Sequence, residues 1–285
     1  HIVTMIELAE EIQRLFLLND KNNRDMERSI FSQLREALST GKVRAAEPDP
    51  SSPTGWKVNV WVKQGILMGF RSGKLITYPS TLQEISFLDK DTLPLKELDP
   101  TTRIRVVPGG SSIRDGAYIG LDVICMPPMY INIGAYIGAE SLIDSHALVG
   151  SCAQVGQRVH VSAGAQIGGV LEPVGALPVI IEDEALIGGN TGLYEGALIR
   201  KRAVIGAGTV LTGSTPVYDL PKRQLLKPEP NMPIIIPEGA VVVPGARAVT
   251  ASPGKEWGIS LATPVIIKYR DNRTDTRTEL EKWIR

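Results

Sequence analysis

The sequence repeats with a period of six residues over much of its length, a spacing that neither an α-helix nor a simple β-strand produces. Apolar residues stand at ten consecutive positions six apart: Ile113, Ile119, Cys125, Ile131, Ile137, Ile143, Val149, Val155, Val161 and Ile167. The run breaks at 172–179 and resumes, shifted by eight residues, at Ile181, Ile187, Leu193, Ile199, Ile205 and Leu211. A looser third stretch covers 234–249.

Side-chain alternation explains this period. In a strand, residues i and i−2 share a face, so each aliphatic residue and the residue two before it, such as Val161 and Val159, both point inward. A few residues of strand and one corner make six, and three such sides close a coil of about 18 residues. Coils then stack by parallel hydrogen bonding about 4.8 Å apart. The repeat predicts a mainly β chain built on a hexapeptide-type, left-handed parallel β-helix.

The rest of the chain divides around this repeat. Residues 1–104 are predicted to form an α-rich head with two amphipathic helices, the second of which stops at Gly41. A further helix is favoured over a strand pair at 56–73. The β-helix is assigned to 105–251, with insertions at 173–180 and 217–233, and a strand and helix tail to 252–285.

Composition excludes several classes of protein. The 31 basic and 31 acidic residues cancel, which argues against a nucleic-acid partner. No run of 18 apolar residues suggests a membrane span, and no export signal is recognised at the N-terminus. The two cysteines form no disulfide framework, so a cytoplasmic location is expected.

The repeat is a scaffold and does not identify a function. Acyltransferases, metal-dependent carbonic anhydrases and non-catalytic binding proteins are the alternatives considered for this scaffold. Only His146 and His160 lie in the repeat, which disfavours a three-histidine zinc site. The insertions, head and tail favour an enzyme, because they supply walls for a site. His160 lies between two inward valines and is expected to point outward, which suits either catalysis or a surface role.

Several segments closely resemble the tetrahydrodipicolinate N-succinyltransferase family. They are "RVVPGGSSIRDGAYIG", "MPPMYINIGAYIG", "IDSHALVGSCAQVGQRVHVSAGAQIGGVLEP", "VIIEDEALIG" and "YEGALI". The resemblance implies succinyl transfer from succinyl-CoA to the amino group of ring-opened tetrahydrodipicolinate, in diaminopimelate and lysine synthesis, with release of CoA. It also implies a homotrimer with active sites between subunits and no metal. An acetyl-CoA-dependent N-acetyltransferase stays open as an alternative, as does a non-catalytic solenoid.

The same resemblance implies the site residues. The family's catalytic acidic pair falls on Asp144 and Glu195, and its substrate-binding arginine falls on Arg105, just before the first coil. A guanidinium suits a dicarboxylate substrate, because it binds carboxylates in bidentate fashion, and Arg114 is a second candidate. The segment "GGNTGLYEG" lacks the arginine that the family carries there. Three further residues are candidates for CoA binding: Gly208, Gly245 and Lys255.

The hexad count adds a geometric prediction. With the insertion taken as one corner, Ile143 and Leu193 are seven hexads apart, which is not a multiple of three. Asp144 and Glu195 should therefore occupy different corners of one prism, about 11 Å apart along its axis. We expect each active site to take Asp144 from one subunit and Glu195 from a neighbour.

Overall fold

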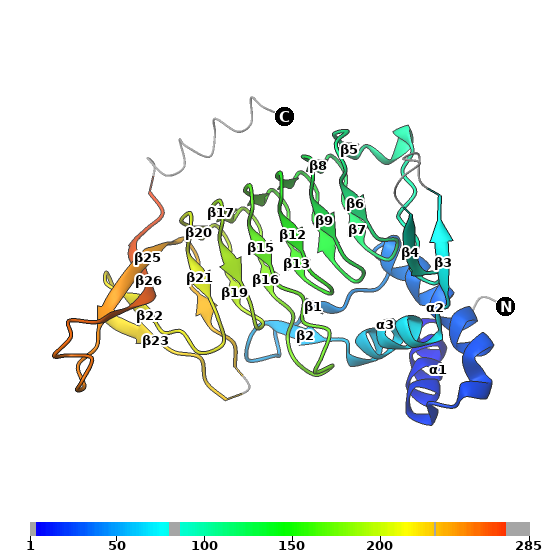
Figure 1. The fold of residues 1–285 in the computed structure, drawn as a ribbon, viewed down its shortest axis with the longest axis horizontal. Coiled ribbons are helices and arrows are strands. Elements are labelled where there is room, and N and C mark those ends of the chain that lie inside the picture. Colours follow the sequence, from blue (N-terminus) through cyan, green and yellow to red (C-terminus); the bar gives the residue numbers. More distant parts are fainter. Residues whose placement is uncertain (1–3, 80–85, 231, 272–285) are drawn as a thin grey trace.

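A computed structural model describes residues 4–79, 86–230 and 232–271. A three-sided β-helix runs through the middle of the molecule, with a helical head beside its first coils and a long β-hairpin at its far end (Figure 1). The chain is therefore organised around the repeat, as the sequence predicts.

Each side of the β-helix is a ladder of two-residue parallel strands, and one of the three ladders is extended at one end by longer strands. We name the three ladders sheets D, E and F. Sheet D contains β5 (Arg105–Val106), β8 (Ile124–Cys125), β11 (Leu142–Ile143), β14 (His160–Val161), β17 (Leu186–Ile187) and β20 (Val204–Ile205). Sheet E contains β6 (Ser112–Ile113), β9 (Tyr130–Ile131), β12 (Leu148–Val149), β15 (Gln166–Ile167), β18 (Gly192–Leu193) and β21 (Val210–Leu211). Sheet F contains β7 (Tyr118–Ile119), β10 (Tyr136–Ile137), β13 (Gln154–Val155), β16 (Ile180–Ile181), β19 (Leu198–Ile199) and β24 (Ile235–Ile236).

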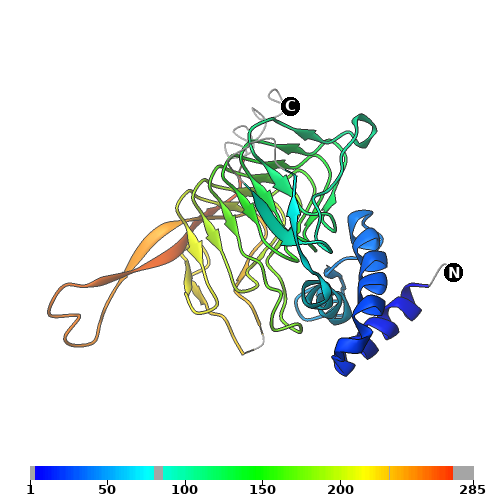
Figure 2. The ribbon, with the colours of Figure 1, turned by 45° about the vertical axis from the view of Figure 1, so that its right-hand side comes forward.

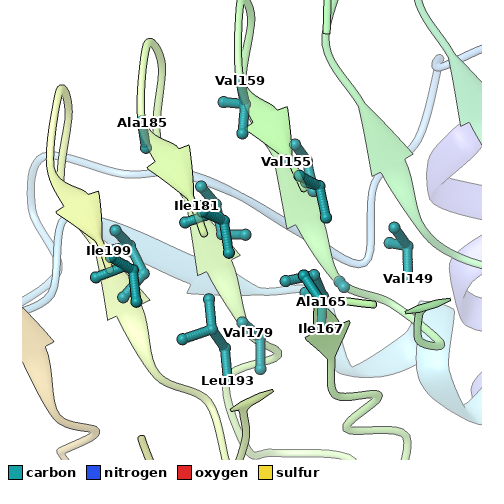
Figure 3. Packing of buried hydrophobic residues seen from close by; sticks show 14 of the residues in the cluster. Val149, Val155, Val159, Ala165, Ile167, Val179, Ile181, Ala185, Leu193 and Ile199 are labelled. Carbon is teal, nitrogen blue, oxygen red and sulfur yellow. The ribbon is translucent and has the colours of Figure 1, made fainter. Parts of the chain in front are cut away.

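The aliphatic row of the repeat fills the interior. Every one of the sixteen hexad positions predicted from the sequence is the second residue of a strand and is buried, with at most 6% of its surface exposed. Smaller inward residues such as Ala165 and Ala185 occupy the positions two before, and the rows stack along the axis (Figure 3). Burying one such aliphatic side chain contributes about 1.5–3 kcal/mol, so the stacked rows account for much of the stability of the coil.

The head is formed by α1 (Met5–Leu18), α2 (Arg24–Ser39) and α3 (Val60–Ser72). Thr4 and Glu7 form a capping box at the start of α1, which satisfies backbone donors that the helix leaves open. Gly41 adopts a left-handed φ of 73° just beyond the end of α2, as predicted for a residue that stops this helix. Short 3₁₀ turns lie at Lys21–Asn23 and Pro100–Thr102.

Two short hairpins complete the head, and one of them corrects the sequence prediction. The helix favoured at 56–73 begins only at Val60, because β2 (Trp56–Val58) pairs antiparallel with β1 (Ala46–Pro48). β3 (Leu75–Tyr78) and β4 (Phe87–Lys90) form the second hairpin. The first hairpin packs on the coil, since Ala46 and Trp56 share an apolar cluster with Ile180 and Leu198.

The last described strands form an arm that leaves the prism. The start of β25 (Ala240–Ala248) continues sheet D by pairing parallel with β20, and the whole strand pairs antiparallel with β26 (Ser260–Tyr269). The resulting hairpin projects away from the coils (Figure 2). β22 (Val217–Asp219) pairs with β26 and with β23 (Gln224–Leu226), so the 217–233 excursion joins the same sheet. The helical part predicted for the tail lies outside the described residues.

Candidate active site

Asp144 and His160 meet on the outer surface of sheet D. Asp144 directly follows β11, and His160 opens β14, the next strand of the ladder, opposite Leu142. The Asp144 Oδ2 atom lies 3.7 Å from His160 Nε2, and Asp144 Oδ1 accepts the backbone N–H of Ser145 at 2.7 Å. The two side chains are 31% and 20% exposed, although the His160 Nε2 atom itself is buried. A carboxylate held in this way can accept a proton.

His160 points outward, as alternation predicts. It stands between Val159 and Val161, which are fully buried, while its own ring is partly exposed. The contact between His160 and Asp144 was not among the predictions from the sequence. The hexapeptide repeat could have predicted this contact. Residues about 18 apart lie on neighbouring strands of one sheet, and Asp144 and His160 both face outward. His146, by contrast, lies in the corner turn with a left-handed φ of 61°.

Arg105 lies on the same sheet as this pair. Arg105 was expected at the start of the predicted β-helix, and it lies there on β5, which pairs parallel with β8, which in turn pairs with β11. Arg105 is thus two strands from Leu142 in the ladder, about 9–10 Å along the axis, and it is exposed. The structure therefore places the exposed Arg105 side chain and the Asp144 carboxylate on the same side of the prism.

Glu195 lies at another corner. It is in the turn between β18 of sheet E and β19 of sheet F, with a left-handed φ of 52°, and its Oε2 atom accepts the backbone N–H of Gly213. Asp144 stands at the corner between sheets D and E. The two carboxylates occupy different corners of the prism, in agreement with the hexad count.

Arg114 joins the head to the coil. Its Nε atom donates to the Tyr130 hydroxyl at 2.8 Å, and its Nη1 atom donates to Asp89 Oδ2 at 2.7 Å and to the carbonyl oxygen of Leu93 at 3.0 Å. These contacts hold β4 of the head against sheet E. Arg114 thus has a visible structural role, and a role in substrate binding stays a prediction.

Gly208 and Gly245, which are far apart in the sequence, line one pocket. Its volume is about 190 Å³, and Thr215, Thr263 and Pro264 complete much of its wall. A Cβ atom at Gly208 would come no closer than 3.9 Å to Pro244, so this corner leaves open space beside the backbone. Lys255 is exposed in the loop between β25 and β26 and is not part of this wall.

The thiols are unsuited to covalent catalysis. Burial raises the pKa of both Cys125 and Cys152 to about 12, so neither is a thiolate at neutral pH. Within 4–79, 86–230 and 232–271, no three His, Cys, Asp or Glu side chains gather in a way that could hold a metal ion. In the same ranges, no helix has both the length and the apolar character needed to cross a membrane.

Comparison with known proteins points to one family. Residues 7–72 match the family described as tetrahydrodipicolinate N-succinyltransferase N-terminal, and residues 178–213 match the hexapeptide repeat of succinyl-transferase. A 2,3,4,5-tetrahydropyridine-2,6-dicarboxylate N-succinyltransferase from Bradyrhizobium diazoefficiens is 37% identical over 262 residues, covering 90% of both chains. The enzyme of the same name from Xylella fastidiosa strain Temecula1 is 36% identical, covering 99% of this chain and 98% of its own.

A solved structure shares the fold. It is named as a 2,3,4,5-tetrahydropyridine-2-carboxylate N-succinyltransferase from Campylobacter jejuni. The TM-score is 0.50 at 16% identity, and the match covers 87% of this chain and 63% of that one. At this identity the likeness supports the fold and not the function.

Proposed function

Because the chain belongs to the tetrahydrodipicolinate N-succinyltransferase family, we propose that it transfers succinyl from succinyl-CoA to the amino group of ring-opened tetrahydrodipicolinate. The observation that carries this proposal is the identity of 36–37% to enzymes of that name over 90–99% of the chain. The reaction would serve diaminopimelate and lysine synthesis. The cytoplasmic location expected from the sequence stays a prediction.

In the proposed mechanism, Asp144 is the general base. The substrate nitrogen attacks the thioester carbonyl carbon while Asp144 takes a proton from that nitrogen. The C–N bond forms, the C–S bond breaks, and the leaving CoA sulfur takes up the proton held by Asp144, which gives the thiol and restores the carboxylate. The 3.7 Å approach of His160 to Asp144 supports this role, because a neighbouring imidazole can orient the carboxylate and stabilise its charge.

Arg105 is proposed to bind a substrate carboxylate. It is exposed on the outer face of sheet D, as is Asp144 at the edge of that sheet. A guanidinium can hold a carboxylate through two parallel hydrogen bonds, which fixes the orientation of the substrate as well as its position. The acceptor would then span the distance from Arg105 to Asp144.

The donor is proposed to bind along the glycine-lined pocket at the far end of the coils. Gly208 leaves open space that would allow a narrow chain such as pantetheine to approach the backbone closely, whereas Gly245 lines the same pocket but its missing side chain makes room for Val265 of β26. Lys255, at the end of the arm, is proposed to reach CoA phosphates. The chemistry uses a thioester donor and needs no metal.

The active site is proposed to be shared between subunits of a homotrimer. Asp144 and Glu195 stand at the two corners that bound sheet E, so one prism cannot turn both toward the same ligand. A neighbouring prism related by a three-fold axis can present its Glu195 beside Asp144. Glu195 would then stabilise or orient the amine as it is acylated.

The test is release of free CoA thiol from succinyl-CoA and from acetyl-CoA, each with and without tetrahydrodipicolinate. The proposal predicts release that requires the acceptor and is much faster with succinyl-CoA. Acetyl-CoA turning over as fast or faster would replace the succinyl assignment with acetyl transfer. Failure of both donors to release thiol in the presence of acceptor would contradict the transferase assignment.

A further inference from the structure

A second cavity lies between the head and the coil, at the corner that carries neither proposed carboxylate. It has a volume of about 310 Å³ and is lined by Arg44 and Trp56 from the head and by Tyr136, Asp183 and Lys201 from the coil. The coil residues belong to β10 or to the turns between sheets F and D. Asp144 stands at the D–E corner and Glu195 at the E–F corner, so this cavity is separate from both.

Among the described residues, the Arg44 guanidinium forms no ion pair with a carboxylate. Its Nε atom donates to Gln154 Oε1 at 2.9 Å, and its guanidinium carbon lies 3.7 Å from the centre of the Tyr136 ring and 5.4 Å from that of Trp56. In the described part of the chain, neither terminal nitrogen forms an ion pair or a hydrogen bond. Burial lowers the pKa of Arg44, because the charged form loses hydration there. A ligand carboxylate beside Arg44 would stabilise the charged guanidinium and so compensate for the hydration that it loses on burial.

Asp183 offers the opposite charge on the coil side. Its Oδ1 atom accepts the backbone N–H of Gln157 at 2.9 Å, and in the described ranges its other oxygen accepts no hydrogen bond. Glu182 is used differently, because its carboxylate accepts from Trp56 Nε1 and from Arg200, each at 2.9 Å. Lys201 adds a second cation to the lining, so the cavity offers a ligand the Arg44 and Lys201 charges and one carboxylate oxygen of Asp183.

The two aromatic walls complete the recognition surface. The Arg44 guanidinium stacks on the face of the Tyr136 ring, and Trp56 is held by its hydrogen bond to Glu182. These contacts hold both aromatic walls in place. The volume lies at the small end of the range for ligand pockets. A molecule of this size that carries both charges would fit better than a simple anion, whose charge Asp183 would repel.

We propose that this cavity binds a small zwitterionic amino acid, with its carboxylate on Arg44 and its ammonium group on Asp183. Its side chain would lie toward Trp56 and Tyr136. Since Arg44 and Trp56 belong to the head while Asp183 and Lys201 belong to the coil, the bound amino acid would tie the two parts together. The proposal goes beyond the transferase function and does not depend on it.

Isothermal titration of the full chain tests the proposal. The probes are L-lysine, L-glutamate and L-leucine, with glutarate and cadaverine as molecules that carry only one kind of charge. At least one amino acid is expected to bind more tightly than both single-charge probes. Arg44→Met and Asp183→Asn should each weaken that binding at least about tenfold, whereas Arg103→Met, at an exposed arginine paired with Asp122, should leave it unchanged.

Other outcomes would overturn the proposal. Absence of heat with all three amino acids, or equal binding of glutarate, would remove the zwitterion assignment. Binding that survives both variants but is lost in Arg105→Met would move the ligand to the proposed acceptor site. The Asp183→Asn variant keeps the Oδ1 acceptor for Gln157, so the test stands even if Arg44→Met does not fold. None of these outcomes affects the CoA-release assay.

Discussion

The carboxylate of Asp144 faces the imidazole of His160 across neighbouring strands of sheet D, with Oδ2 and Nε2 3.7 Å apart. The contact arises from the repeat itself, because one coil later the chain returns to the same side of the prism with another outward residue. Asp144 therefore has a polar partner within its own subunit. The partner from another subunit is proposed to be Glu195.

Replacing Asp144 by Asn tests the proposed base. Asparagine keeps the Oδ1 acceptor for the Ser145 N–H, so the corner turn should persist and the melting temperature should change little. Turnover should fall by about a hundred- to ten-thousand-fold, the usual contribution of general base catalysis. Steady-state CoA release and thermal melting check this. A variant that retains more than a tenth of wild-type turnover would contradict the role.

His160→Gln separates an orienting role from a catalytic one. At 3.7 Å the Asp144–His160 contact is longer than a hydrogen bond and is expected to be worth no more than about 1 kcal/mol. We therefore expect the turnover of His160→Gln to fall by less than about tenfold, with the KM for succinyl-CoA unchanged. A loss as large as that in Asp144→Asn would instead make His160 the base. The measurement is the same CoA-release assay on both variants side by side.

Gly208→Ala tests the donor pocket. Gly208 has a φ of 75°, so alanine adds backbone strain of about 1–2 kcal/mol, and its methyl group would occupy open pocket space. We expect a higher KM for succinyl-CoA and an unchanged KM for the acceptor. Gly239→Ala is the matched control, since Gly239 has a φ of 68° and no close neighbour but lies outside the pocket. Equal KM values in the two variants would contradict the assignment.

The buried thiols predict a loss of stability in alkali. Burial raises the pKa of Cys125 and Cys152 to about 12, whereas an unfolded cysteine ionises near a pH of about 8.5. The folded state therefore holds its thiol protons longer, and the stabilisation is complete below about pH 8.5 and is lost as the pH rises toward 12. Each thiol lowers the free energy of unfolding by about 1.4 kcal/mol per pH unit in this window.

Urea unfolding of the wild type and of a Cys125→Ala, Cys152→Ala double variant at pH 8 and pH 10 measures this effect. Alanine does not titrate, so the double variant should lose less stability between the two pH values than the wild type does. The comparison uses the change with pH in each protein, which cancels the constant cost of the smaller side chains. Parallel pH dependence in the two proteins would contradict the prediction.

The coil could be predicted from the sequence in detail because its physics is local. Whether a side chain such as Val161 points inward depends on its position within six residues, and every coil repeats that rule. Counting hexads also predicted that Asp144 and Glu195 lie at different corners of the prism. Arg105 opens the β-helix at the boundary assigned from the sequence, and its strand, β5, precedes the clear part of the repeat and is recognised only by its pairing with β8.

The contacts between the head and the coil could not be predicted in the same way. Arg44 meets Gln154 across 110 residues of chain, and Trp56 meets Glu182 across 126. Such contacts depend on how two finished units pack, and no periodic signal in the sequence reports this packing. The strand at Trp56–Val58 was missed for the same reason, since its pairing partner and its apolar cover both lie outside the segment.

Complementation between two inactive variants tests the shared active site most directly. Asp144→Asn and Glu195→Gln are prepared separately, unfolded, mixed in equal amounts and refolded, with Glu140→Gln, an exposed glutamate in a similar left-handed turn, as the control. If each site takes one carboxylate from each of two neighbouring subunits, random mixing restores about a quarter of the sites, and CoA release should recover to about that fraction of wild type. Activity that stays at the level of the separate variants after mixing would show that both carboxylates act within one subunit or that one of them has no role.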